Sequence, residues 1–271
     1  MTRQQLVQQI KNKQSFLCVG LDSDIHKIPP HLLTYSNPIQ VFNEEIIRAT
    51  QDYCVAYKPN FAFYEALGAQ GWQTLAQTTA NIPQTHLSIA DAKRGDIGNT
   101  AKQYAVSVFE QLQFDAVTLA PYMGADSILP FLQYSDKWAI ILALTSNASA
   151  GEIQHFFNGN EKLYAHVLHL AKSWGTDEQL MFVVGATKAE ALQEIRCIVP
   201  QHFLLVPGVG TQGGNLEDVV KYGINKEVGL LVNVSRDIIY ASSGKDFAAK
   251  AAEKAAFYQS EMQRLLTKYL P

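Results

Sequence analysis

Two carboxylates, one ammonium group and one hydroxyl lie within ten residues of this chain. If residues 86–93 form a strand, Asp91 and Lys93 point to the same side of it, because side chains alternate along a strand. Asp96 then stands at the expected N-cap of the next helix, and Thr100, four residues later, would share its helix face. These groups predict a site at a strand-to-helix junction. A surface turn with an ordinary ion pair is the alternative.

The composition sets broad limits on the function. The chain has 271 residues, of which 47% are hydrophobic and 17% charged, with a formal net charge of -3. This length suits one large α/β barrel or two smaller domains. The mildly negative net charge gives no support for general nucleic-acid binding, which would need a basic stripe. The polar segment 1–13 has the pattern of neither a signal peptide nor an anchor, and the apolar run 138–144 is too short to span a membrane. We therefore expect a cytoplasmic protein that binds neither nucleic acid nor membrane.

The cysteines and acidic residues show no metal-ligand spacing. Cys18, Cys54 and Cys197 are far apart, lie in apolar contexts and adjoin no histidine. We interpret them as reduced packing residues, with a catalytic cysteine as the weaker alternative. Asp91 and Asp96 could hold magnesium, but nearby lysines supply competing positive charge. We expect no metal.

Apolar strand patterns alternate with helical patterns eight times along the chain. The expected strands are residues 16–21, 54–58, 86–93, 115–119, 138–144, 180–184, 203–206 and 229–234. The expected helices include residues 3–12, 41–51, 61–80 with a break near Gly68 and Gly71, 162–174, 188–198, 216–222 and 245–266. Such alternation predicts a parallel sheet, and eight units predict a (β/α)8 TIM barrel that forms a single domain over residues 1–271. A doubly wound sheet is the alternative.

In such a barrel the active site forms at the carboxyl ends of the strands. The polar residues expected there are Asp22, Lys58, Asp91, Lys93, Ser146, Gln212 and Arg236. A lysine at a buried strand end needs a carboxylate partner, or it loses its charge. Because the first three strands are neighbours, we predict one alternating charge network of Asp22, Lys58, Asp91 and Lys93 rather than separate surface pairs.

A glycine-rich loop follows the seventh expected strand, and Ser235 and Arg236 follow the eighth. Barrels commonly bind phosphate at this place through backbone N–H groups at a helix start. The loop, residues 207–215, has the spacing of neither a Walker loop nor a dinucleotide fingerprint. We interpret it as a lid over a phosphate, to which Arg236 and Gln212 add donors. A connection without function is the alternative.

The segment Asp-Ala-Lys-Arg-Gly-Asp-Ile-Gly-Asn-Thr (residues 91–100) resembles the signature of the orotidine 5′-phosphate decarboxylase family, in its longer bacterial-type subgroup. The resemblance covers nearly the whole chain. It continues in Gly-Leu-Asp (20–22), Tyr-Lys-Pro-Asn (57–60), Leu-Thr-Ser-Asn (144–147), Pro-Gly-Val-Gly-Thr-Gln-Gly-Gly (207–214) and Asn-Val-Ser-Arg (233–236). One departure is Ala148, where proline is expected, and it affects no expected catalytic residue.

The resemblance implies an enzyme that removes CO2 from orotidine 5′-monophosphate (OMP) to give UMP, without metal or organic cofactor. This reaction is the last step of pyrimidine biosynthesis. Lys93 would stabilise the ring carbanion and protonate it. Asp91 would face the departing carboxylate and hold Lys93 in place. Lys58 and Asp22 would bind ribose hydroxyls and complete the network.

The resemblance also implies which residues would contact the other parts of the substrate. Ser146 would contact the pyrimidine edge. Pro207, which opens the glycine-rich loop, is expected to contact the substrate, and Gln212, Arg236 and the region of Ser235 would bind the phosphate. By the same likeness, Asp96 and Thr100 would reach into the site of a partner subunit, which implies a homodimer.

Two other functions fit parts of the sequence. A magnesium-dependent sugar-phosphate decarboxylase or aldolase of the same superfamily shares an Asp-x-Lys-x-x-Asp motif, but it needs an acidic ligand near the second strand, where this chain has Lys58. A non-catalytic barrel that binds a phosphate ligand would keep Gln212 and Arg236. It would have no reason to keep Lys58, Asp91 and Lys93 together.

Overall fold

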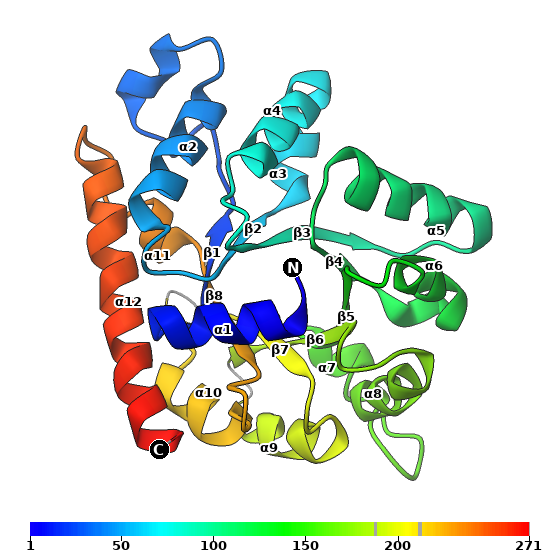
Figure 1. Cartoon of the computed structure of the whole chain (residues 1–271). Helices are drawn as coiled ribbons and strands as arrows, with labels where there is room; N and C mark the ends of the chain where they lie inside the picture. Colours follow the sequence, from blue (N-terminus) through cyan, green and yellow to red (C-terminus); the bar gives the residue numbers. More distant parts are fainter. Residues whose placement is uncertain (187–188, 211–212, 271) are drawn as a thin grey trace.

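The computed structural model describes residues 1–186, 189–210 and 213–270. Within these ranges, eight parallel strands close into a barrel, each pairing with the next along the chain and β8 pairing with β1 (Figure 1). The strands are β1 (Leu17–Leu21), β2 (Ala56–Pro59), β3 (Leu87–Arg94), β4 (Ala116–Leu119), β5 (Trp138–Leu144), β6 (Leu180–Val184), β7 (Phe203–Pro207) and β8 (Leu230–Val234). The predicted TIM barrel is confirmed. The doubly wound alternative is wrong, because an open sheet would leave β1 and β8 unpaired.

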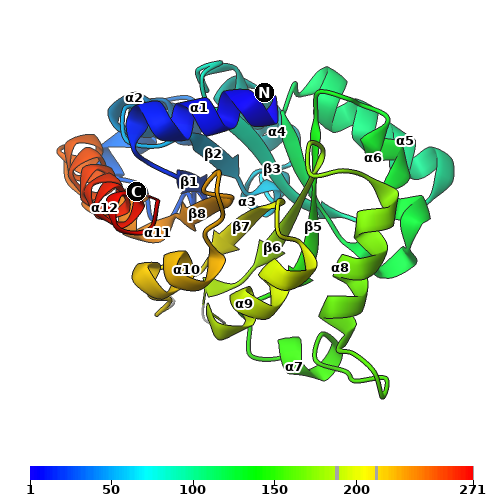
Figure 2. The same cartoon turned by 60° about the horizontal axis from the view of Figure 1, so that its bottom comes forward.

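Helices surround this barrel and connect its strands (Figures 1 and 2). The α-helices are α1 (Arg3–Lys13), α2 (Pro38–Thr50), α3 (Phe61–Glu65), α4 (Gly68–Ala80), α5 (Gly98–Ala105), α6 (Leu129–Leu132), α7 (Ala150–Ile153), α8 (Leu163–Trp174), α9 (Ala189–Ile198), α10 (Leu216–Gly223), α11 (Arg236–Ile239) and α12 (Phe247–Tyr269). Shorter turns are η1 (Pro30–Thr34), the π-helical η2 (Val106–Gln111), η3 (Pro121–Met123) and η4 (Ala125–Ser127).

Apolar strands, and helices that are apolar on one face, explain this arrangement. Every residue of β1, β6 and β8 is buried, because the barrel core covers one face of each strand and the helices cover the other. In α2 the buried side chains Ile39, Phe42 and Ile46 recur at helical spacing, so one stripe of the helix packs on the core. Each large apolar side chain buried in this way contributes about 1.5–3 kcal/mol.

The helix expected over residues 61–80 differs from the structure in an informative way. It is divided into α3 and α4 at Ala66 and Leu67, and Gly68 begins α4 with a φ of 61°. Gly71 was expected to interrupt the helix, yet it lies inside α4. A side-chain carbon at Gly71 would be 1.7 Å from the carbonyl oxygen of Tyr64, so this glycine permits a close backbone approach.

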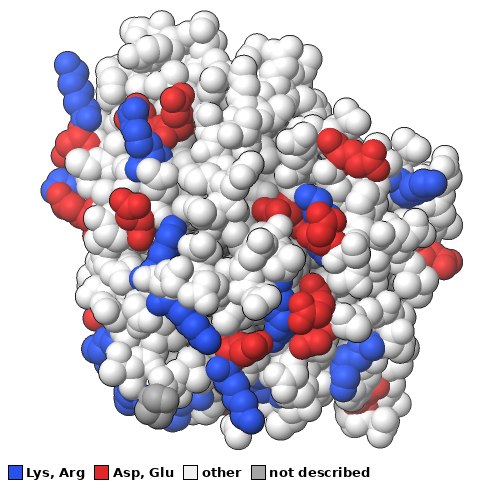
Figure 3. Space-filling view, viewed as in Figure 1, with Lys and Arg blue, Asp and Glu red and all other residues white. Residues whose placement is uncertain are grey.

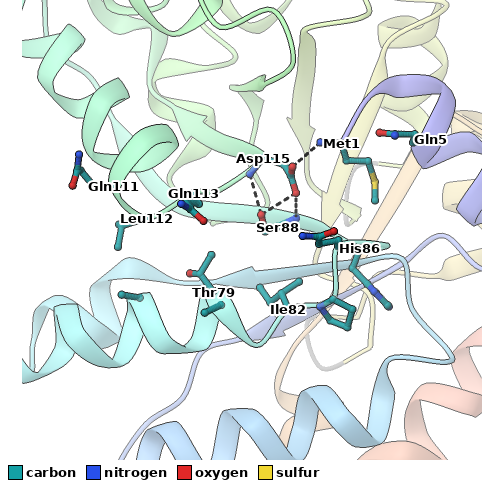
Figure 4. Close-up of a pocket in the computed structure, with 14 residues that line it drawn as sticks. Met1, Gln5, Thr79, Ile82, His86, Ser88, Gln111, Leu112, Gln113 and Asp115 are labelled. Carbon is teal, nitrogen blue, oxygen red and sulfur yellow. Dashed lines mark hydrogen bonds and ion pairs between the residues drawn. The ribbon is translucent and has the colours of Figure 1, made fainter.

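The end of the barrel where the strands begin is covered by α1 (Figures 1 and 2). The Met1 ammonium contacts Asp115 Oδ1 at 2.6 Å, and Asp115 Oδ2 accepts hydrogen bonds from the backbone N–H and the hydroxyl of Ser88. A cleft of about 610 Å³ lies here, with His86 and Gln113 in its lining (Figure 4). Since Ser88 and Asp115 lie at the beginnings of β3 and β4, this cleft is remote from the carboxyl strand ends.

The surface carries both signs of charge. On the face shown in Figure 3, Lys and Arg side chains are interspersed with Asp and Glu rather than gathered into one basic patch. None of the helices in the described part of the chain is long and apolar enough to cross a bilayer.

Candidate active site

The carboxyl ends of β2 and β3 bring two ammonium groups onto one carboxylate. Lys58 Nζ lies 2.6 Å from Asp91 Oδ2, and Lys93 Nζ lies 2.5 Å from Asp91 Oδ1. Each oxygen of Asp91 therefore has its own charged donor, which is the strong form of hydrogen bond. Three of the four predicted members of the charge network are in direct contact.

Two of the three charged groups in this cluster are buried, so their charges strongly affect one another's pKa values. Lys58 is 5% and Asp91 9% exposed, whereas the side chain of Lys93 is 52% exposed. Burial alone would lower the pKa of Lys58, but the carboxylates of Asp91 and Asp22 outweigh it and raise that pKa above its ordinary value. Burial alone would raise the pKa of Asp91, but Lys58 and Lys93 hold it well below its usual range. Asp91 is therefore an anion and Lys58 a cation at neutral pH.

Asp22, the fourth predicted member, follows β1 and acts on Lys58 through its charge. Its Oδ1 atom is buried and accepts no hydrogen bond from the described residues, so it can accept one from a ligand. The loop is held by Tyr240, which the sequence analysis missed. Its hydroxyl accepts from the Asp24 N–H at 2.7 Å and donates to the Asp22 carbonyl at 2.8 Å. Asp22 and Tyr240 are far apart in the sequence, and no local pattern links them.

The backbone of β3 is irregular where it carries Lys93. The pairing with β4 shifts between Ala90 and Arg94, and Lys93 has a φ of 48°, in the left-handed region. The Thr118 hydroxyl on β4 accepts hydrogen bonds from the backbone N–H groups of Ala92 and Lys93. The alternation of a regular strand therefore predicted the right neighbours, Asp91 and Lys93, but a bulge brings them together.

Asp96 and Thr100 lie apart from this cluster. The predicted N-cap at Asp96 is wrong, because α5 begins at Gly98 with Ile97 as its N-cap, and the Asp96 carboxylate accepts only its neighbour's N–H among the bonds described. Asp96 thus precedes the helix and does not share its face with Thr100. Thr100 is exposed and lines a different cleft, of about 280 Å³, beside Arg94.

A cleft of about 330 Å³ opens beside the Lys58–Asp91 pair. Its lining includes Asp22, Lys58, Asp91, Pro207, Ser235, Arg236 and Tyr240. This volume is at the lower end of the range of small-molecule sites, about 300–1,000 Å³. The cleft therefore joins the charge cluster at the ends of β1, β2 and β3 to the expected phosphate region at the ends of β7 and β8.

The phosphate region is partly built by close packing. Ser235 Oγ donates to the carbonyl of Gly20 at 3.0 Å, and a side-chain carbon at Gly20 would lie 2.8 Å from Ser235 Cβ. Gly20 thus gives Ser235 the room to approach β1. The side chain of Arg236 is exposed at the cleft. Gln212 lies outside the described residues.

Ser146 follows β5 and is half-buried. A side-chain carbon at Gly185, which follows β6, would lie 2.8 Å from both the nitrogen and the Cβ of Ser146. A residue with a side chain at position 185 would therefore clash with Ser146. Ser146 is absent from the described lining of the 330 Å³ cleft. The structure thus places Ser146 after the end of β5, as predicted, but outside the described wall of this cleft.

No group of three or more His, Cys, Asp or Glu side chains is arranged to hold a metal ion within residues 1–186, 189–210 and 213–270. The arrangement can instead present a partly exposed ammonium, Lys93, next to a fixed anion, Asp91. Such a pair can donate a proton to a carbanion and stabilise its developing charge.

Because Lys58 and Asp91 are buried, removing one of these charges should lower the stability of the protein. Replacing Lys58 by Met should lower the free energy of unfolding by about 3–5 kcal/mol, because Asp91 keeps its charge in a buried place with one cation fewer. The double variant Lys58→Met with Asp91→Asn should recover part of this loss. Urea unfolding measures both. Lys27→Met, at an exposed lysine 3.8 Å from Asp24, is the control and should change stability by less than about 1 kcal/mol. A Lys58→Met loss as small as that of the control would contradict the tight pair.

Comparison with known proteins shows the family of this chain. Residues 15–252 match the orotidine 5′-phosphate decarboxylase / HUMPS family. The chain is 56% identical to an orotidine 5′-phosphate decarboxylase of Christiangramia forsetii, covering 99% of this chain and 100% of that protein, and 53% identical to one of Bacteroides fragilis, covering 98% of each. It is also similar to the crystal structure of a putative orotidine-monophosphate decarboxylase of Toxoplasma gondii (TM-score 0.85, 35% identity, covering 96% of this chain and 98% of that one). With its barrel, its Lys58–Asp91–Lys93 cluster and these matches, the chain belongs to the orotidine 5′-phosphate decarboxylase family.

Proposed function

We propose that this chain converts OMP to UMP and CO2 in UMP biosynthesis, as a carboxy-lyase that uses neither metal nor organic cofactor. The observation that carries the proposal is the contact of both Asp91 oxygens with Lys58 and Lys93. Asp91 and Lys58 line the 330 Å³ cleft, and Lys93 reaches it through its contact with Asp91. Membership of the family supports it independently.

Lys93 is the proton donor in this proposal. When the bond between the ring and the carboxylate breaks, CO2 leaves and the electron pair stays on the ring carbon. The Lys93 ammonium stabilises this charge and then transfers a proton to the carbon. Its half-exposed side chain suits the role, because the lysine must recover a proton from solvent after each turnover.

Asp91 and its neighbours prepare this step. Asp91 holds Lys93 charged and in place, and it faces the departing carboxylate of the substrate. Lys58 and Asp22 bind the ribose hydroxyls. The buried, unbonded Oδ1 of Asp22 supports this assignment, since it lacks a donor that a hydroxyl would supply.

The other end of the cleft takes the phosphate. Arg236 offers a fork of donors, and Ser235 and Pro207 line the same cleft. Gln212 remains part of this proposal on the resemblance alone. Ser146, from the end of β5, contacts the pyrimidine edge. Binding the phosphate, which does not react, can support the chemical step through remote binding energy.

We also propose a homodimer in which Asp96 and Thr100 complete the partner's site. Unlike Lys93, which contacts Asp91, Asp96 and Thr100 make no described hydrogen bond or ion pair with the charge cluster and line no described part of the 330 Å³ cleft. Ile97, which follows Asp96, is 50% exposed. Tyr122 and Met123, which follow the segment that packs on Gly95 through Ala120, are 91% and 48% exposed. A second copy of this chain would cover this apolar surface and bring Asp96 to the other site.

No observation favours the other two functions. A magnesium-dependent sugar-phosphate enzyme would need an acidic ligand at the end of β2, where Lys58 forms an ion pair. A binding protein without catalysis would gain nothing from a costly buried cluster. The single domain and the cytoplasmic location stay predictions from the sequence.

The first test is turnover. The protein, treated with a chelator, should convert OMP to UMP at the rate of the untreated protein, as measured by the loss of absorbance of the orotate ring. Lys93→Ala should reduce turnover at least about 100-fold while UMP still binds, because the proton donor is lost. Lys11→Ala, at an exposed lysine of α1 at the other end of the barrel, is the matched control. Unchanged absorbance over hours with the wild-type protein would refute the function, and substantial turnover by Lys93→Ala would remove Lys93 from its role.

The second test concerns the shared site. Lys93→Ala and Asp96→Ala subunits, each inactive alone, should regain about a quarter of the wild-type activity when mixed equally, because half of the dimers are hybrids with one intact site of two. Mixing Lys93→Ala with the double variant Lys93→Ala, Asp96→Ala creates no intact site and is the control. If subunits exchange but activity does not return, Asp96 serves its own subunit.

A further inference from the structure

The regular pairing of β3 and β4 is interrupted opposite Thr118, whose side chain carries a hydroxyl. Ala90 pairs with Val117 and Arg94 with Leu119, so residues 91–93 on β3 face Thr118 alone on β4. Three residues against one cannot keep the regular ladder of hydrogen bonds. The N–H groups of Ala92 and Lys93 bond instead to Thr118 Oγ1, at 3.0 and 2.9 Å.

The same hydroxyl also reaches the charge cluster. Thr118 is 1% exposed, so water cannot readily take its place. Its oxygen accepts two N–H groups, and its own proton points to Asp91 Oδ1 at 3.3 Å or to the Ala90 carbonyl at 3.5 Å. The Thr118 side chain thus contacts the backbone N–H groups of both Ala92 and Lys93. It also contacts the Asp91 carboxylate, which binds the Lys93 ammonium.

The conformation that Thr118 supports is unfavourable by itself. Lys93 has a φ of 48°, which a residue with a side chain adopts only when its surroundings stabilise it. In this conformation the Lys93 Nζ atom lies 2.5 Å from Asp91 Oδ1. If Ala92 and Lys93 lost their acceptor, two N–H groups in the bulge would be unsatisfied, and the bulge would relax.

We propose that Thr118 is the positioning residue for Lys93, and that its hydroxyl fixes the bulge that sets the ammonium at the reacting carbon. The inference rests on the proposed decarboxylation for its effect on rate. Thr118 donates no proton to substrate and acts only through Lys93 and Asp91. Its loss should therefore lower kcat while leaving KM nearly unchanged, since the ribose and phosphate contacts come from other strands.

The test compares Thr118→Val, which keeps the shape and loses the hydroxyl, with Thr118→Ser, which keeps the hydroxyl. Thr118→Val should lower kcat by about 10- to 100-fold, the effect of a displacement near 1 Å, with KM and the Kd for UMP within about twofold of wild type. Thr118→Ser should keep kcat within a few fold. Thr79→Val is the matched control, because Thr79 is a buried threonine whose hydroxyl bonds within α4. It should keep the wild-type kcat.

A crystal structure of Thr118→Val provides a readout that is independent of activity. Lys93 should leave the left-handed region, and its Nζ should move away from Asp91. If Thr118→Val does not fold, Thr118→Ala takes its place with the same expectations. A kcat within twofold of wild type, an equal loss in Thr118→Ser, or an unmoved Lys93 would overturn the proposal. If the wild-type protein does not decarboxylate OMP, the proposed function fails, while the position of Lys93 in the variant structure still decides the role of Thr118.

Discussion

The site depends on the charge of one buried carboxylate. Asp91 is only 9% exposed, and an isolated anion in such a place would be strongly destabilised. Lys58 and Lys93 each contact one of its oxygens, so the anion is stable only while β2 and β3 hold both lysines in position. Asp22 adds a second negative charge near Lys58 and keeps the alternation of signs. The functional groups therefore fix one another as well as being fixed by the barrel.

This arrangement suits a reaction whose difficulty is a developing negative charge. An ammonium that is already in place needs no reorganisation when a carbanion forms, and this preorganisation is the main source of electrostatic catalysis. Closure of the barrel supplies the rigid frame, since β1 pairs with both β2 and β8. Because of that pairing, Asp22 and Lys58 on one side and Ser235 and Arg236 on the other line a single cleft.

Much of this was predictable from the sequence. The eight apolar strand patterns gave the barrel, and the position of Lys58, Asp91 and Lys93 at strand ends gave their contact. The rest depended on tertiary structure. The left-handed Lys93 follows from a shift in pairing with β4, and the contact of Tyr240 with the Asp22 loop joins distant segments. Gly71 was misjudged because its role is to admit a carbonyl from another helix. Thr118 did leave a signal, as the single hydroxyl in the apolar strand Ala116–Leu119.

The central claim is that the Lys93 ammonium meets the charge that forms on the ring. The most direct measurement compares the affinities of wild type and Lys93→Ala for UMP and for a UMP analogue with an ionised oxygen at the carbon that carries the carboxylate in OMP. Wild type should bind the analogue at least about 100-fold more tightly than UMP, as expected of a group that imitates the transition state. Lys93→Ala should lose most of that preference and keep its affinity for UMP. An unchanged preference in Lys93→Ala would contradict the account.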